Sequence, residues 1–75
     1  MKATIRTKNA GTFCDVELKS VMEYSIAFDV MKKQTTAEQI CDVMEYGKAN
    51  ITDYTDRIHI CIAKKYVKDV IISEL

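Results

Sequence analysis

The side chains best suited to nucleophilic chemistry in this chain are one histidine, His59, and three cysteines, Cys14, Cys41 and Cys61. A cysteine nucleophile needs a base within hydrogen-bond reach. His59 and Cys61 share one face of an extended segment, but two residues of strand rise separate them by about 7 Å. Only the tertiary fold would bring Cys14 or Cys41 to His59. We therefore interpret these residues as packed thiols and an ordinary half-buried histidine, and we predict no catalytic residue and no enzymatic activity.

The same four side chains equal the number of ligands in a structural zinc site. Zinc ligands normally occur in close pairs, and here His59-x-Cys61 is the only close pair. Cys14 also falls on an apolar strand face, where a free cysteine packs as a small hydrophobe. We predict no metal and no cofactor. An odd number of dispersed cysteines is typical of reduced thiols, and we expect a cytoplasmic protein.

The charged residues are balanced in number, with 11 basic and 11 acidic, but they are segregated along the chain. Residues 34–56 carry five acidic residues against Lys48 alone. Three of these, Glu38, Asp42 and Glu45, recur at i, i+4 and i+7, and therefore lie along one face of a helix. This acidic ridge (Glu38, Asp42 and Glu45) is either a solvated helix face or a surface that meets a basic protein partner.

Two other segments, residues 1–13 and 57–68, contain Lys and Arg but no acidic residue. If both are strands of one sheet, they would gather a positive patch beside the ring of Phe13, a composition typical of nucleic-acid surfaces. The residues of this alternative interface are Arg6, Lys8, Arg57 and Lys64. Because the net charge is zero, we expect nucleic acid to be a less favoured partner than protein.

A further candidate surface is the sheet face opposite the predicted core. It would carry His59, Cys61, Ala63, Phe13, Ala27 and Met31. A partly apolar exposed face commonly marks an interface, so Phe13 and His59 join the acidic ridge as candidate protein-binding residues. Contact through this face or through a sheet edge would give a homodimer and supply burial that a small chain lacks. Alternatively, a loop or the C-terminal segment covers the face.

The elements that must position these residues begin with a β-hairpin, in which residues 2–7 and 12–18 flank a turn at 8–11. Its predicted register sets Lys2 opposite Glu17, an opposite-charge pair. The apolar pairs of the same register are Ile5 with Cys14, Ala3 with Val16, and Met1 with Leu18.

Residues 22–30 alternate apolar and polar side chains, which predicts a third strand. A loop at 19–21 would give it three facing pairs with the second strand: Leu18 with Met22, Val16 with Tyr24, and Cys14 with Ile26. The cost of this register is that Glu17 faces Glu23, a like-charge pair.

An amphipathic helix is predicted to begin at Thr36, a capping residue that is followed three positions later by Gln39. It ends at Gly47, which occupies the C′ position. Residues 48–56 then form a connection with at most a short extended piece near Ile51. The alternation at 57–63 predicts a strand with three isoleucines inward. The tail, 64–75, is a helix with Val67, Val70, Ile71 and Leu75 inward, or else a strand, because it is rich in β-branched residues.

At 75 residues the chain has room for a single domain, 1–75, with a small core. We expect an α+β fold, a small antiparallel sheet of three or four strands with one or two helices packed on one face, in the order β-β-β-α-β-α. No apolar stretch reaches the roughly 18 residues of a membrane span, so no membrane partner is expected. The predicted function is non-enzymatic binding of another protein, as in small regulators and inhibitors encoded by phages and mobile elements, with nucleic-acid binding as the alternative.

Overall fold

The computed structural model describes residues 1–75 and consists of a six-stranded antiparallel sheet with one α-helix and two short 3-10 helices. The elements in chain order are β1 (Lys2–Thr7), β2 (Thr12–Val21), β3 (Ser25–Met31), η1 (Lys32–Gln34), α1 (Ala37–Tyr46), β4 (Asn50–Asp53), β5 (Arg57–Ala63), η2 (Lys64–Tyr66) and β6 (Val67–Glu74). The strand order across the sheet is β4-β5-β3-β2-β1-β6.

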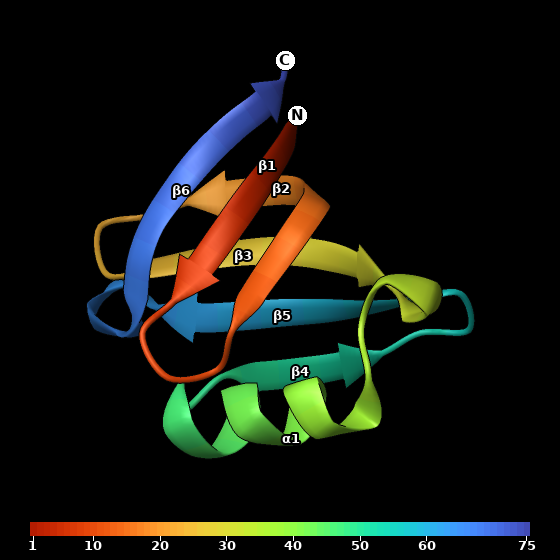
Figure 1. Ribbon diagram of the computed structural model, residues 1–75. Coiled ribbons are helices and arrows are strands. Elements are labelled where there is room, and N and C mark those ends of the chain that lie inside the picture. Colours follow the sequence, from red (N-terminus) through yellow and green to blue (C-terminus); the bar gives the residue numbers. More distant parts are fainter.

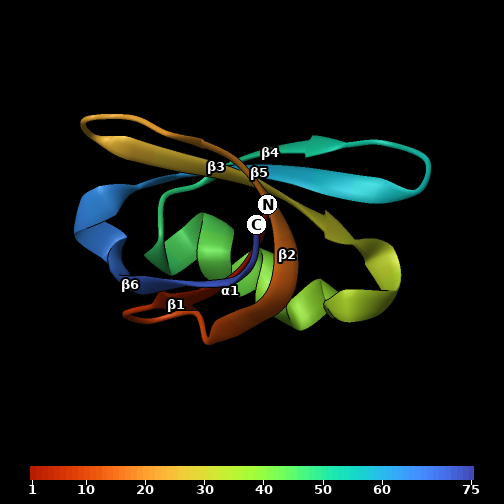
Figure 2. The ribbon, with the colours of Figure 1, turned by 90° about the horizontal axis from the view of Figure 1, so that it is seen from above.

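The sheet folds back on itself so that its two halves face each other across the core. β3, β5 and β4 form one layer, β1 and β6 form the other, and β2 belongs to both (Figures 1 and 2). Two register shifts bend β2, because a bulge places an extra residue in one strand and increases its twist. α1 lies across one end of the layers, beside β4 (Figure 1).

The predicted fold of three or four strands with one or two helices is wrong, because six strands make the chain mostly sheet. The tail, for which a helix and a strand were the two alternatives, forms η2 and the strand β6, and β6 pairs with β1 along its length. The short extended piece expected near Ile51 in the connection at 48–56 is β4, and it pairs with β5. Both segments pair along the free edge of a neighbouring strand, which satisfies backbone N–H and C=O groups. The β-branched residues of the tail also favour an extended backbone.

The first hairpin keeps the predicted register only near its open end, where Lys2 faces Glu17 and Ala3 faces Val16. Towards the turn, Ile5 faces Phe13 instead of Cys14. The register shift between these pairs is the first bulge of β2, which inserts an extra residue at Cys14 and Asp15. Phe13 therefore turns into the core, with 1% of its surface exposed, and Cys14 turns to solvent.

The second predicted hairpin register is also wrong. β2 continues to Val21, so Leu18 faces Phe28 and Val21 faces Ile26. Met22 and Tyr24 lie in the exposed turn that joins β2 to β3 instead of in a strand. The strand at 57–63 has the predicted bounds, and its Ile60 and Ile62 are fully buried.

One hydrophobic core fills the space between the layers. Its largest fully buried side chains are Phe13, Phe28, Ile5, Ile60, Ile62, Val16, Val30 and Val43. The rings of Phe13 and Phe28 lie 5.2 Å apart between centroids at a tilted angle, a favourable geometry for an aromatic pair. Because these two rings come from β2 and β3, their contact fixes the corner at which the sheet folds back.

α1 closes the core with Val43, and the helix begins and ends where the sequence predicts. Thr36 caps its N-terminus by accepting a hydrogen bond from the backbone N–H of Gln39. Gly47 is the C-cap itself, with an ordinary φ of −97°, and the left-handed residue is Lys48. Gly47 is needed for space: a Cβ there would lie 2.8 Å from the carbonyl oxygen of Val43 and 3.0 Å from Ile62 Cδ1.

We therefore expect Gly47→Ala to destabilise the fold by about 1–2 kcal/mol, because the added methyl group meets backbone and a buried isoleucine. Urea unfolding followed by circular dichroism measures the difference. Cys41→Ala, on the exposed side of the same helix, is the control and is expected to change stability by less than about 0.5 kcal/mol. Equal midpoints for the wild type and Gly47→Ala would contradict the close packing of α1 on β5.

Candidate functional site

The acidic ridge lies on the side of α1 that points away from the core. Val43 and Gly47 are buried on the inner side of the helix. At about 100° of rotation per residue, Glu38 and Glu45 lie nearly opposite that inner side. Both are exposed, and Asp42 beside them is half-buried. The three carboxylates therefore form one continuous outward surface, as predicted.

Hydrogen bonds to other elements hold α1 in a fixed position. Gln39 accepts a hydrogen bond from the Thr35 hydroxyl at 2.9 Å and donates from Nε2 to the backbone carbonyl of Thr12 at 3.0 Å. The Gln39 side chain thus ties the helix to the start of β2 and does not accept from the backbone N–H of Thr36, as it would in a capping box. The ridge is therefore presented on a helix that is tied to the sheet by this hydrogen bond.

None of the three ridge carboxylates forms an ion pair or a side-chain hydrogen bond. Glu38, in the first turn, is favoured by the positive end of the helix dipole, whereas like charges at i+4 and i+7 oppose one another. Met44 and Tyr46 are half-exposed on the flanks of the ridge. Unpaired acids beside Met and Tyr side chains make a surface suited to a cationic partner.

The structure does not bring Phe13 and His59 to this surface. Phe13 is buried between the layers, so it is unavailable to a partner. His59 lies half-buried on the outer face of β5, where it faces Asp29 on β3 and Thr52 on β4. The predicted protein-binding set therefore separates into the ridge, a core residue and a sheet residue.

The outer sheet face around His59 carries a charged cluster that the sequence reasoning missed. His59 donates from Nδ1 to Asp29 Oδ1 at 2.6 Å, and Arg57 donates from Nε to Asp29 Oδ2 at 3.2 Å. Lys19 Nζ lies 3.8 Å from the same carboxylate. With only 11% of its side chain exposed, Asp29 is the centre of this cluster, and the face is polar there instead of apolar.

The basic residues of the alternative interface separate into two kinds. Arg6 donates from Nε to Asp69 Oδ1 at 2.8 Å and from Nη2 to the other oxygen, so its charge is neutralised across β1 and β6. These hydrogen bonds raise the pKa of Arg6 and lower the pKa of Asp69. Arg57 pairs with Asp29 and Asp56. Neither arginine is free to bind a polyanion.

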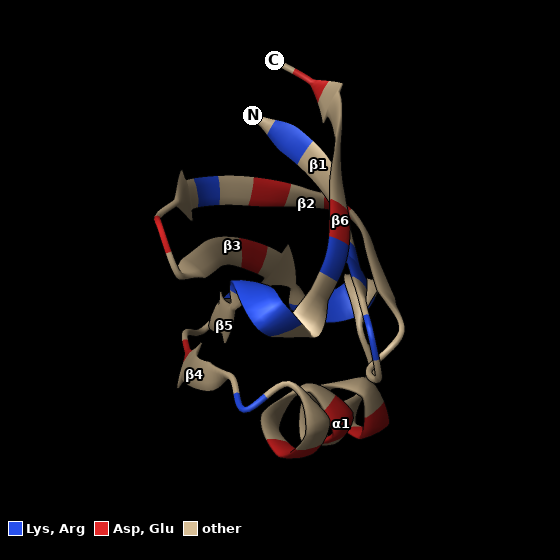
Figure 3. Ribbon diagram, turned by 90° about the vertical axis from the view of Figure 1, so that its left-hand side faces the viewer, with Lys and Arg blue, Asp and Glu red and all other residues tan.

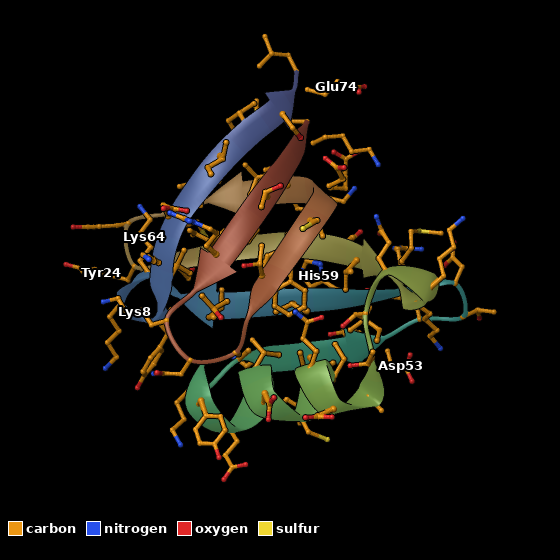
Figure 4. All side chains as sticks on the ribbon, viewed as in Figure 1. Lys8, Tyr24, Asp53, His59, Lys64 and Glu74 are labelled. Atoms are coloured by element: carbon orange, nitrogen blue, oxygen red, sulfur yellow. The ribbon has the colours of Figure 1, made fainter.

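Lys8 and Lys64, by contrast, lie on the same side of the molecule and form no ion pair (Figure 4). The backbone N–H of Lys8 donates to the Tyr66 carbonyl at 2.9 Å, and that of Lys64 donates to the Tyr24 carbonyl at 2.9 Å. Exposed Lys65 joins them on η2. We call Lys8, Lys64 and Lys65 the basic end. Figure 3 shows Lys and Arg gathered here and acidic residues on α1.

At the end of the sheet opposite α1, the Met1 ammonium donates to Glu17 Oε2 at 2.6 Å, and this hydrogen bond lowers the pKa of Glu17. A shallow cavity of about 220 Å³ opens beside it, lined by Met1, Leu18, Lys19, Ser20 and Val21. It contains neither the histidine nor a cysteine.

The three cysteines differ in their exposure to solvent and in the residues that surround them. Cys14 and Cys41 are exposed on β2 and α1, and Cys61 is half-buried on β5, facing Ala27 and Asn50. The structure contains no group of three or more His, Cys, Asp or Glu side chains arranged to hold a metal ion.

None of the helices combines the length and the apolar character that crossing a membrane requires. Comparison of the chain with protein-family models, with curated proteins and with solved structures found no match.

Proposed function

We propose that the protein acts by binding a second protein, and that the acidic ridge of α1 is the binding surface. The observation that carries this proposal is that Glu38, Asp42 and Glu45 point outward from a fixed helix with no cation paired to any of them. Of the eight acidic residues outside the ridge, five do have a cationic partner, and these are Glu17, Asp29, Asp53, Asp56 and Asp69. The partner that fits this surface is a protein with a basic patch.

The flanking side chains support a protein partner. Half-exposed Met44 and Tyr46 add apolar contact area on either side of the carboxylates. Such residues are enriched in interface cores, while charges at the rim increase the association rate and select the partner. The fixed position of α1 means that little conformational entropy is lost when it binds.

Affinity capture from the host lysate, with and without nuclease, tests this proposal. Captured proteins are identified by mass spectrometry, and the affinity of each is then measured by titration calorimetry. We expect Glu38→Lys/Asp42→Lys/Glu45→Lys to weaken binding at least about 100-fold, since the loss of three favourable charge contacts of about 1 kcal/mol each already has this effect and the new lysines add repulsion.

The matched control is Glu23→Lys/Asp53→Lys/Asp56→Lys, which changes the net charge equally at exposed acidic residues outside the ridge. It is expected to bind like the wild type. Equal weakening by both triple variants would attribute binding to net charge, and a partner insensitive to the ridge would contradict the proposal.

A second candidate function, nucleic-acid binding, is favoured by the basic end. Lys8 and Lys64, which have no ion pair, lie on the same side of the molecule as Tyr24 (Figure 4), whose surface is 77% exposed and free to stack on a base. Binding of single-stranded RNA or DNA would then fall steeply with salt and would be lost in Lys8→Ala/Lys64→Ala/Lys65→Ala. If nuclease treatment abolishes the capture, and this triple variant also captures nothing, the partner is nucleic acid.

A further inference from the structure

β6 is the exposed edge of the sheet and is twice as long as the other edge strand, with eight residues against four in β4. It pairs with β1 on one side only, so its outward N–H and C=O groups have no strand partner. Ile71 and Ile72 are 51% and 43% exposed. A long edge with apolar side chains is a template for pairing with another strand.

The sequence of β6 is complementary to itself when two copies run antiparallel. With Ile71 on the two-fold axis, Ile71 faces Ile71 of the second copy and Val70 faces Ile72. Lys68 then faces Glu74, and this ion pair occurs twice because of the symmetry.

Other alignments of the two edges lack this complementarity. Shifting the second copy by one residue in one direction places Asp69 opposite Glu74, a like-charge pair. Shifting it in the other direction places Lys68 opposite Ser73 and leaves both charges unpaired. A parallel alignment in register stacks Lys68 on Lys68 and Glu74 on Glu74. A register displaced by five residues also pairs Lys68 with Asp69, but it overlaps only residues 67–70 of each β6 and leaves Ile71 and Ile72 outside the contact. Charge and apolar overlap together therefore favour the alignment about Ile71.

The backbone of β6 sets the length of the contact. Its pairing with β1 shifts register at two places, between Glu74 and Ile72 and between Asp69 and Val67. Only the segment from Asp69 to Ile72 is regular, and it carries the two exposed isoleucines. Lys68 and Glu74 lie just outside it at the two irregularities, so the proposed ion pairs flank the regular contact at its ends. Such a short strand contact is expected to give a weak, reversible interface, with a dissociation constant on the order of 100 µM.

We propose that two copies of this chain form a two-fold dimer by antiparallel pairing of β6 about Ile71, which joins the two sheets into one. β6 lies at the opposite edge of the sheet from β4, and α1 lies beside β4 (Figure 1). The proposal depends only on the β6 edge and not on the ridge function.

The test is sedimentation equilibrium from about 10 µM to about 1 mM protein, a range that spans the expected dissociation constant. The wild-type mass is expected to rise from 8.6 kDa towards twice that value. Lys68→Glu alone and Glu74→Lys alone each place like charges at both ends of the interface and are expected to remain monomeric. Ile71→Lys, which sets two ammonium groups on the axis, is expected to do the same.

Two restorations make the test specific. The double variant Lys68→Glu/Glu74→Lys recreates both ion pairs and is expected to dimerise like the wild type. An equimolar mixture of the two single variants is expected to form heterodimers for the same reason. Lys65→Glu, an exposed change outside β6, is the control and is expected to dimerise normally.

Circular dichroism confirms folding of each variant, which matters because Glu74 also faces Lys2 on β1. A wild type that remains monomeric up to about 1 mM overturns the proposal. Folded single variants that dimerise like the wild type, or restorations that fail, also overturn it. In each of these cases the ridge can still bind its partner, so the two proposals fail independently.

Discussion

Phe13→Ala is expected to lower the free energy of unfolding by about 3–5 kcal/mol, because it removes a fully buried ring and leaves a cavity. The ring of Phe28, 5.2 Å away between centroids, would lose its aromatic partner as well. The total stability expected for a 75-residue domain is only about 4–11 kcal/mol. Denaturant unfolding should therefore show a much lower midpoint, or a chain largely unfolded at 37 °C.

Cys14→Ala, one residue further along β2, is the matched control for this prediction. Cys14 is exposed, so its substitution should change stability by less than about 0.5 kcal/mol. The two variants distinguish the two hairpin registers, since an unbulged β2 would bury Cys14 and expose Phe13. A large loss for Cys14→Ala with a small loss for Phe13→Ala would refute the bulge.

Asp29→Ala is expected to destabilise the fold by about 2–3 kcal/mol. Its carboxylate accepts hydrogen bonds from His59 and Arg57, and charged hydrogen bonds of this kind contribute about 1.5–3 kcal/mol where solvent is largely excluded. Removing it also leaves Arg57 close to Lys19 without the anion that joins them. Thermal and urea unfolding both measure this loss.

Asp56→Ala is the control, because Asp56 also pairs with Arg57, at 3.1 Å, but has a side chain that is 63% exposed. Exposed pairs are screened by water, so a change below about 0.5 kcal/mol is expected. Asp29→Asn keeps the shape of the side chain and one acceptor oxygen, so its loss of stability should lie between those of Asp29→Ala and Asp56→Ala. Equal losses at Asp29 and Asp56 would show that the outer cluster is merely a set of surface charges.

Sequence periodicity was enough to locate the elements whose pattern is strong and local. The helix from its Thr36 cap to Gly47 and the strand at 57–63 have the predicted bounds, because capping chemistry and alternation act within a few residues. The acidic ridge was predictable for the same reason, since i, i+4 and i+7 spacing on a known helix fixes its direction.

The remaining errors come from interactions between distant residues. Neither bulge of β2 contains a glycine that would have marked it in the sequence. At the first bulge, Asp15 itself takes the positive φ of 50°. Without the bulges, Phe13 was placed on the wrong face. β6 became a strand because β1 lies beside it, and the Asp29 cluster depends on the pairing of β3 with β5. The only local signal for that cluster was that Asp29 and His59 each occupy an outward position in the alternating pattern of their own strand.

The pairing of β1 with β6 joins segments from opposite ends of the sequence, and this has a consequence for how the chain folds. β1, β2 and β3 are neighbours in sequence and can pair early, whereas closing β1 on β6 forms a loop of about sixty residues and costs correspondingly more chain entropy. Contacts of such high contact order form late. Any state of the chain in which β6 is detached leaves the second edge of β1 open, and that edge is then a strand that other chains can capture.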